Sequence, residues 1–198
     1  MKSTQKITII GAGHIGLQLS NQFIKHKTSR PSDITVTRKD ENGLAEIRKE
    51  LKINTSTDNL KAVKGSDVVI LAVRPQDMKS VAEELKNVIQ KNQIIVSVAA
   101  GLGIGFYEKY FPHNQIFRVM PNPFLSSGLG AMAYAKNKNV NSSGDKLIRH
   151  LFGGLSEEFM EIRDEEMHLF TTMAASSAAV FYYLFDAFQK TALKYKFN

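Results

Sequence analysis

A glycine-rich loop close to the start of the chain constrains the fold more than any other feature. The apolar, β-branched run Ile7–Ile10 predicts a buried strand, and residues 11–16, which follow it, read Gly-Ala-Gly-His-Ile-Gly. Apolar residues at helical spacing come next, so the loop joins a strand to a helix. This order is typical of a dinucleotide-binding unit, in which the first glycine allows a tight turn, the second lets the backbone approach a pyrophosphate, and the third lets helix pack on strand. The alternative is a glycine-rich turn that binds no nucleotide.

Beyond the loop, predicted strands and helices alternate. Strands are expected at 34–37, 68–73, 93–98, 116–120, 131–135 and 159–162, and helices at 42–51, from Pro75 to about Ile89, at 104–111 and at 144–152. Pro121 and Pro123 are expected to end the strand at 116–120, and 137–144 to form a surface loop. The alternation predicts an α/β fold with a Rossmann-type doubly wound, mostly parallel sheet.

From Asp164 onward the pattern changes to a long helix with a wide apolar face. We therefore expect two parts: a dinucleotide-binding Rossmann domain over 1–163 and a helical dimerisation segment over 164–198. Aromatic residues point to several sides of this helix, namely Phe170, Phe181, Tyr182, Tyr183, Phe185 and Phe188. One face of the Rossmann domain cannot cover them all, which favours a homodimer.

Composition narrows the classes of partner. The net charge is +7, but the lysines are scattered without a dense basic run, so we expect no nucleic-acid partner. The chain has no cysteine, which excludes disulfides and thiolate metal sites, and its five histidines lack metal-site spacing, so we expect no metal. Neither a leader-like apolar start nor a membrane-length apolar run is present, so we expect a cytoplasmic protein without a membrane partner.

The residues after the second expected strand indicate which dinucleotide binds. A site for NAD(H) usually has an acidic side chain there to hold the ribose hydroxyls, whereas this chain has Arg38 and Lys39. Arg38 can hold a 2′-phosphate with charge-assisted hydrogen bonds, which an acid would repel. Asp40 and Glu41 come next and are expected to begin a helix. We therefore expect NADP(H) to be preferred over NAD(H); the alternative for Arg38 is an ordinary solvated side chain.

Three later segments carry a family resemblance. Ala72–Gln76 reads Ala-Val-Arg-Pro-Gln, Ser97–Gly101 reads Ser-Val-Ala-Ala-Gly, and Arg118–Asn122 reads Arg-Val-Met-Pro-Asn. With the glycine loop, these segments resemble the pyrroline-5-carboxylate reductase family, which catalyses the last step of proline synthesis. The resemblance covers roughly residues 6–190 and implies NADPH-dependent reduction of a cyclic imino acid by a dimer. Together, the loop, the basic pair and the resemblance give the expected cofactor-binding residues: Gly11, Ala12, Gly13, His14, Ile15, Gly16, Arg38, Lys39, Asn59, Ala72, Val73, Arg74, Pro75, Val98, Ala99 and Ala100.

The resemblance weakens towards the C-terminus. Thr171 keeps the family position whose hydroxyl touches the substrate nitrogen, which makes it the candidate catalytic residue, and Asn122, Thr171 and Ser176 are the candidate substrate contacts. A serine, a glycine and a proline of the family motif are here Ala174, Ala175 and Ala178. Because glycine and proline break helices, these alanines predict one long helix from about Glu165 to Lys194. The alternative for Thr171 is a hydroxyl bonded back to its own helix.

Three functions stay open at this point. The first and preferred is an imine reductase of the pyrroline-5-carboxylate type. The second is a paralogue that binds the dinucleotide, reduces poorly or not at all, and acts as a regulatory or interaction protein. It is suggested by the absence of the Ser-Pro-Gly-Gly-Thr-Thr segment with which the family binds the substrate carboxylate. The third is a β-hydroxyacid dehydrogenase, which needs a lysine on the long helix, and the chain has none between Asp164 and Gln189.

Overall fold

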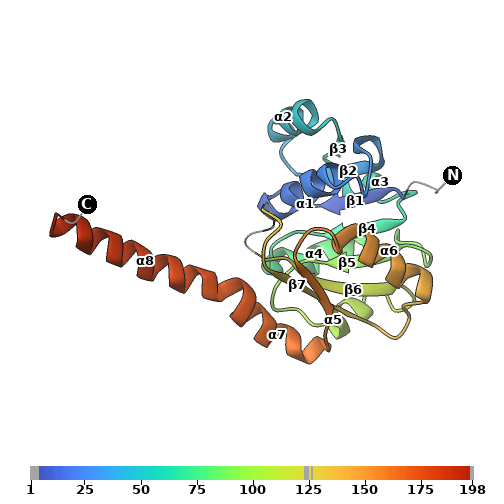
Figure 1. Ribbon diagram of the computed structural model, residues 1–198. Helices are drawn as coiled ribbons and strands as arrows, with labels where there is room; N and C mark the ends of the chain where they lie inside the picture. The colour runs from blue at the N-terminus through green and yellow to red at the C-terminus, as the bar shows by residue number, and fades with distance from the viewer. Residues whose placement is uncertain (1–4, 123–124, 126, 197–198) are drawn as a thin grey trace.

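The computed structural model describes residues 5–122, 125 and 127–196, and in this part of the chain eight strands form one sheet (Figure 1). Its order is β3-β2-β1-β4-β5-β6-β7-β8, and every neighbouring pair is parallel except the antiparallel β6 and β7. The strands are β1 Ile7–Ile10, β2 Ile34–Thr37, β3 Asn54–Ser56, β4 Val68–Leu71, β5 Ile94–Ser97, β6 Gln115–Met120, β7 Ala131–Lys136 and β8 Glu158–Glu161.

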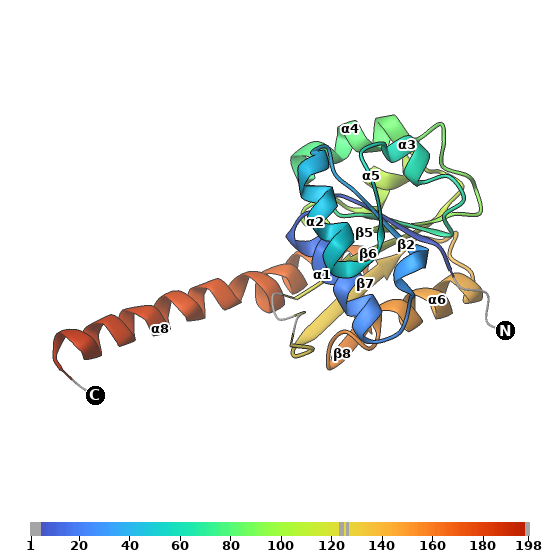
Figure 2. The same ribbon diagram turned by 90° about the horizontal axis from the view of Figure 1, so that it is seen from above.

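The helices lie on both faces of this sheet (Figures 1 and 2). The α-helices are α1 His14–Lys25, α2 Glu41–Leu51, α3 Asn59–Ala62, α4 Pro75–Leu85, α5 Ile104–Glu108, α6 Ser142–Phe152, α7 Met167–Phe170 and α8 Ser177–Lys194. Short 3-10 helices cover Pro31–Asp33 (η1) and Asp164–Glu166 (η2), and a π-helix (η3) covers Thr171–Ser176. The doubly wound, mostly parallel α/β fold expected from the sequence is confirmed.

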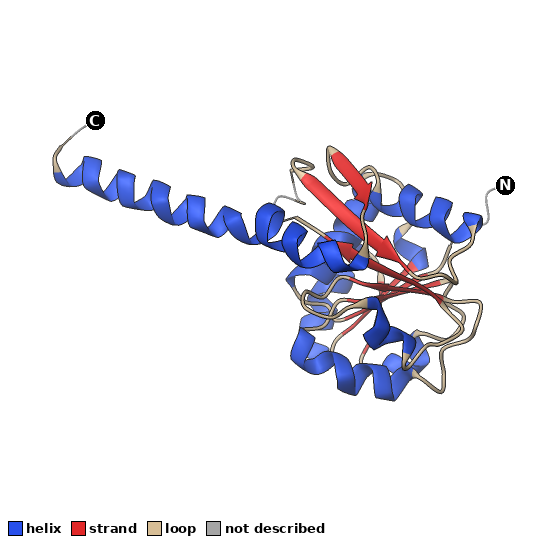
Figure 3. Cartoon of the chain, turned by 90° about the horizontal axis from the view of Figure 1, so that it is seen from below, coloured by secondary structure: helices blue, strands red, loops and turns tan. Residues whose placement is uncertain are grey.

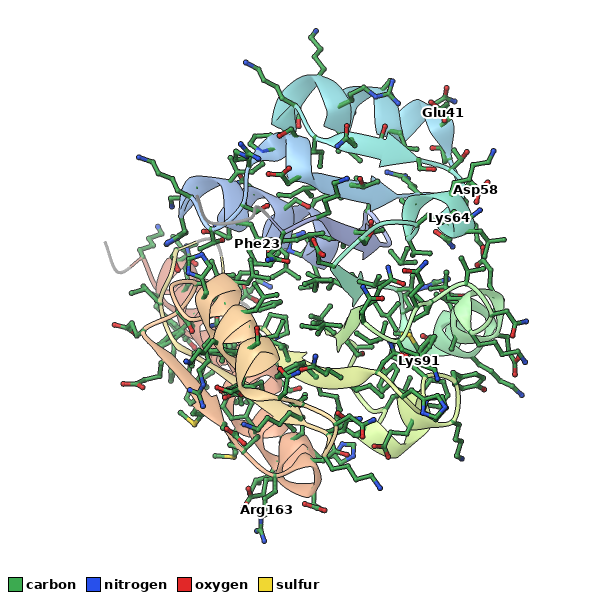
Figure 4. All side chains as sticks on the ribbon, turned by 90° about the vertical axis from the view of Figure 1, so that its right-hand side faces the viewer. Phe23, Glu41, Asp58, Lys64, Lys91 and Arg163 are labelled. Carbon is green, nitrogen blue, oxygen red and sulfur yellow. The ribbon has the colours of Figure 1, made fainter. Side chains whose placement is uncertain are left out.

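Alternation along the buried strands gives the sheet two apolar faces. In β1, Ile7 and Ile9 belong to a core with α1, α2 and α6, whereas Ile10 faces a core with α4 and α5. On the first face, the rings of Phe23 and Phe152 meet edge to face with centroids 5.3 Å apart, and Figure 4 shows Phe23 inside the body. Both faces are covered, as parallel sheets require.

The boundaries differ from the sequence expectations where the pattern is weak. The sequence did not predict β3 and α3, because Asn54, Thr55 and Ser56 form a polar edge strand without an apolar signal. The strand expected to reach Val73 ends at Leu71, and the helix expected to reach about Ile89 ends at Leu85. The expected loop 137–144 is shorter. Asn141 caps α6 by accepting a 2.9 Å hydrogen bond from the N–H of Gly144, so the helix begins at Ser142. Pro121 directly follows β6, and Pro123 lies outside the described residues.

The C-terminal helix packs on the sheet at its base. Met167 is fully buried in a cluster with Ile104 of α5 and with Met120 and Ala133 of the sheet, and Phe170 packs against the same cluster. Phe170 was expected to be exposed and is partly buried, because it lies on this first turn. From there α8 extends away from the body with no buried residue among those described (Figures 1 and 3). Within the described residues, no helix is long and apolar enough to cross a membrane.

The expected long helix is present, but it is not α-helical throughout. The backbone is right-handed helical at Thr171, Ser176 and Ser177, so no loop interrupts the helix, yet Thr171–Ser176 form a π-helix. Thr171 and Thr172 donate hydrogen bonds from their hydroxyls to the carbonyls of Met167 and His168, four residues earlier, as Thr191 does to Ala187 within α8. Alanines remove the penalty against a helix, but helix propensity does not select an α-helix over a π-helix.

A buried ion pair fastens this base to the rest of the fold. Arg118 of β6 is only 2% exposed, and its Nη1 lies 2.5 Å from Oδ1 of Asp164. The second carboxylate oxygen of Asp164 accepts a 2.8 Å hydrogen bond from the N–H of Ile104 at the start of α5. A Cβ on Gly103 would stand 3.0 Å from that oxygen, so a glycine there leaves the carboxylate its space.

We predict that Asp164→Ala strongly destabilises the fold. Removing one partner of a buried pair leaves an uncompensated charge, which costs about 3–5 kcal/mol. Chemical denaturation measures this as a fall in the free energy of unfolding. The matched control is Glu83→Ala, because the Glu83–Lys86 pair is about half exposed and contributes at most about 1 kcal/mol. Equal, small losses in both variants would contradict the anchoring role of Asp164.

Candidate functional site

The β1–α1 turn uses its three glycines in three ways. Gly11 has φ +106°, and a Cβ on it would stand 2.8 Å from the carbonyl oxygen of Ala72. A Cβ on Gly16 would stand 2.1 Å from the carbonyl oxygen of Gly11, so α1 packs directly on the turn. A Cβ on Gly13, by contrast, would meet no atom within 4 Å. The fold itself therefore explains Gly11 and Gly16, whereas Gly13 leaves bare backbone facing open space, as the approach of a pyrophosphate requires.

The glycine turn is hydrogen-bonded to the end of β2 and leads directly into α1. The N–H groups of Gly11 and Ala12 donate to the carbonyl of Thr37 at 3.2 and 2.7 Å. Exposed His14 begins α1, and no acidic residue stands in its first turn. The first N–H groups of a helix have no partner within the helix and carry a partial positive charge. The turn therefore has donors and a field suited to a phosphate group.

A pocket of about 280 Å³ lies beside this turn at the carboxyl ends of the strands. It brings together Gly11, Arg38, Lys39, Asn59, Val73 and Arg74, all of which were expected from the sequence as cofactor contacts. Ile10 and Thr37, at the ends of β1 and β2, also line it. The sequence reasoning missed these two and the α4 residues Asp77, Ser80, Val81 and Glu84. The four α4 residues are spaced three or four apart, as on one face of a helix. Because Pro75 marks the start of α4, the sequence could have predicted that this face lines the pocket.

A second hollow, of about 400 Å³, lies at the opposite edge of the sheet. Its lining includes Lys6, Thr35, Asn54 and Ser66, at the amino ends of the strands. Open α/β sheets bind ligands at the carboxyl ends of their strands, so the smaller pocket beside the glycine turn is the better candidate. Among the described residues, no group of three or more His, Asp or Glu side chains is arranged to hold a metal ion.

Ion pairs on the rim of the pocket are weak. Nη2 of Arg38 lies 3.8 Å from Oδ2 of Asp40, and both side chains are about half exposed. The other oxygen of Asp40 accepts a hydrogen bond from the N–H of Asn42, so this acid caps α2 as expected. Across the pocket, Arg74 pairs with Asp77 at 3.0 Å. Exposed pairs of this kind contribute little, so a bound anion can replace them.

The segment after β5 is held next to the β4–α4 turn. The N–H of Val98 donates to the carbonyl of Leu71 at 3.2 Å, and Val98 and Ala99 are buried while Ala100 is exposed. Ser97 Oγ accepts a hydrogen bond from the N–H of Ala99 and lies 2.5 Å from the hydroxyl of Tyr107. Burial raises the pKa of the Tyr107 phenol, so it stays neutral and keeps this contact.

The three candidate substrate residues are not in this pocket. Thr171 donates its hydroxyl to the carbonyl of Met167 at 2.6 Å, as in the structural alternative for this residue. Asn122 is buried, and its Nδ2 donates to the carbonyl of Leu129 at 2.9 Å, which braces the turn before β7. Ser176 is exposed on the C-terminal helix. Of the other expected cofactor residues, Ala12 lies in the glycine turn and Ile15 in the first turn of α1, while Ala72 directly follows β4 and Pro75 begins α4.

Comparison with known proteins agrees with this geometry. Residues 6–101 match the family model described as NADP oxidoreductase coenzyme F420-dependent. A pyrroline-5-carboxylate reductase from Bacillus spizizenii is 34% identical over 189 residues, which cover 94% of this chain and 63% of the relative. The reductase from Methanosarcina acetivorans is 32% identical, with 92% of this chain and 68% of the relative covered. The chain belongs to the pyrroline-5-carboxylate reductase family.

Solved structures show the same fold. A pyrroline-5-carboxylate reductase from Coxiella burnetii superposes with a TM-score of 0.86 at 26% identity, covering 97% of this chain and 72% of that one. The Plasmodium falciparum enzyme, solved with NADP bound, gives 0.85 at 24% identity, covering 96% and 70%. The chain spans 63% of the length of its Bacillus relatives.

We predict that Gly13→Ala and Gly16→Ala separate binding from folding. Gly13→Ala adds a methyl group into open space, so its melting temperature stays that of the wild type. Dinucleotide affinity, measured by calorimetry, falls at least about tenfold because the backbone is no longer bare where a pyrophosphate approaches. Gly16→Ala forces a contact with the Gly11 carbonyl and lowers stability by about 1–3 kcal/mol. Undiminished dinucleotide binding by the Gly13 variant would show that this turn is not the site.

Proposed function

We propose that this chain is an NADPH-dependent reductase that acts on the C=N bond of a cyclic imino acid of the pyrroline-5-carboxylate type. The observation that carries the proposal is the bare backbone at Gly13 above the start of α1, next to a pocket edged by Arg38 and Lys39. Membership of the family supports the substrate class. The names of the relatives also favour the reductase over a paralogue without activity.

The proposed reaction requires little chemistry from protein side chains. The bound dinucleotide supplies a hydride, and a protonated imine is already an electrophile. The chain must therefore hold the two reactants in place and exclude water. The first turn of α1 and the backbone at Gly13 bind the phosphates, and the segments 72–75 and 98–100 lie along the cofactor. We assign Asn122, Thr171 and Ser176 to the substrate, with the Thr171 hydroxyl turning from its own helix to the imine nitrogen.

We further propose two parts, 1–163 for the dinucleotide and 164–198 for dimerisation. Large apolar side chains are exposed along the C-terminal helix: Leu169, Met173, Val180, Phe181, Tyr182, Tyr183, Leu184, Phe185, Phe188, Leu193 and Tyr195. A surface so apolar favours a partner, and a second copy on a two-fold axis covers it most simply. Cytoplasmic location and the absence of nucleic-acid and membrane partners stay predictions.

The function is tested by following NADPH oxidation spectroscopically with pyrroline-5-carboxylate and other cyclic imines. We expect saturable turnover that is highest with pyrroline-5-carboxylate. Tight NADPH binding without oxidation in the presence of any cyclic imine would instead support the non-catalytic paralogue.

Cofactor preference is expected to depend on Arg38. A hydrogen bond to a charged group contributes about 1.5–3 kcal/mol, so Arg38→Ala weakens NADPH binding about 10- to 100-fold and leaves NADH binding nearly unchanged. Calorimetric titration with both dinucleotides measures the two affinities. Arg48→Ala is the control, because Arg48 lies at the far end of α2 and does not line the pocket. Equal wild-type affinities for NADPH and NADH would refute the preference.

Light scattering tests the dimer. At micromolar concentration we expect about twice the 22.1 kDa mass of the chain. Phe181→Glu combined with Phe185→Glu places charges on the apolar face and shifts the protein to monomer, whereas Lys190→Glu, on the same helix, has a smaller effect. A wild-type mass of one chain at this concentration would rule the dimer out.

A further inference from the structure

The guanidinium of Arg38 lies directly against a glycine of α2. An ideal Cβ on Gly43 would stand 2.6 Å from Nη1, 2.8 Å from Cζ and 3.1 Å from Nε of Arg38. Real Cβ atoms do not approach other heavy atoms closer than about 3.0 Å. Part of the guanidinium, from Nε through Cζ to Nη1, therefore occupies space that a side chain at position 43 would take.

The geometry of a helix explains why position 43 matters. Asp40 is the N-cap of α2, so Gly43 lies in the first turn. Cα–Cβ bonds in an α-helix tilt towards the N-terminus, which is where Arg38 lies. Glycine is among the least favourable residues inside a helix, so a packing reason for it is informative. Gly105 of α5 offers a contrast, because a Cβ there would meet nothing within 4 Å.

The surroundings suit an anion at this point. Arg38 and Lys39 both line the pocket, and the start of α2 adds a partial positive charge. Four carboxylates stand nearby. Asp77 and Glu84 line the same pocket, where Asp77 pairs with Arg74 and Glu84 accepts a hydrogen bond from Asn59. Asp40 lies 3.8 Å from Arg38 in a half-exposed pair, and Glu41 lies 3.8 Å from Arg48, further along the helix. A phosphate with two charges replaces the contact with Asp40, because exposed carboxylate pairs are weak.

We propose that Gly43 is a positioning residue for the choice of dinucleotide. Because Gly43 has no side chain, the guanidinium of Arg38 can lie against the first turn of α2, at the edge of the pocket, where it meets a 2′-phosphate. Any residue with a Cβ at position 43 displaces the guanidinium from that place. NAD(H) has no such phosphate and is indifferent to residue 43. This inference rests on the proposed preference for NADP(H).

The test compares four variants by calorimetric titration with NADPH and NADH: Gly43→Ala, Gly105→Ala, Arg38→Ala, and Arg38→Ala combined with Gly43→Ala. We expect Gly43→Ala to weaken NADPH binding about tenfold, the lower end of the range for a charge-assisted hydrogen bond, with NADH affinity within about twofold of wild type. Its melting temperature stays the same or rises slightly, because alanine is the better helix residue. Gly105→Ala changes neither affinity.

The double variant shows whether Gly43 acts through Arg38. If it does, Gly43→Ala has no further effect once Arg38 is alanine. Additive losses in the double variant, or equal losses of NADPH and NADH binding in Gly43→Ala, would overturn the inference. So would a wild-type preference for NADPH that Gly43→Ala leaves intact, and in that case the proposed cofactor preference itself stands. A wild type without any preference would refute both.

Discussion

The close packing of α1 on the turn after β1 is the contact on which the candidate site depends. At Gly16 the helix comes so near the turn that a Cβ would stand 2.1 Å from the Gly11 carbonyl oxygen. Gly11 in turn lies against the carbonyl of Ala72, which brings the β4–α4 turn beside the glycine turn. The N–H groups of Gly11 and Ala12 tie the same turn to the end of β2. This one turn thus sets the positions of the segments that line the pocket, and the fold itself requires glycine at Gly11 and Gly16.

A second constraint operates at the other end of the chain. The Arg118–Asp164 pair and the buried Met167 hold the base of the C-terminal helix on β6, β7 and α5. Tyr107 of α5 contacts Ser97, which braces the segment proposed to lie along the cofactor. The base of the helix and the cofactor segment are therefore joined by contiguous buried contacts. Beyond that base, no described residue of α8 is buried and many large apolar side chains are exposed, which is why we assign this helix to contacts with a second copy.

Much of this arrangement could be predicted from the sequence because the signals are local. The glycine spacing, the buried β-branched strands and the basic pair after β2 all act over a few residues, and their positions were predicted closely. What could not be predicted depends on distant partners or on the absence of a pattern. Polar β3 has no apolar periodicity that would predict a strand. The contact between Arg38 and Gly43 depends on the conformation of the turn between β2 and α2. The Asp164 carboxylate accepts a hydrogen bond at the start of a helix 60 residues earlier in the chain. The π-helix at Thr171–Ser176 was not predicted, because helix propensity does not distinguish a π-helix from an α-helix.

The most direct test of this account is a crystal structure of the chain with NADPH bound. We predict that the pyrophosphate lies over Gly13 against the first N–H groups of α1, with the 2′-phosphate on the Arg38 guanidinium at the start of α2. Density for the dinucleotide in the hollow at the amino ends of the strands, or a 2′-phosphate turned away from Arg38, would contradict it.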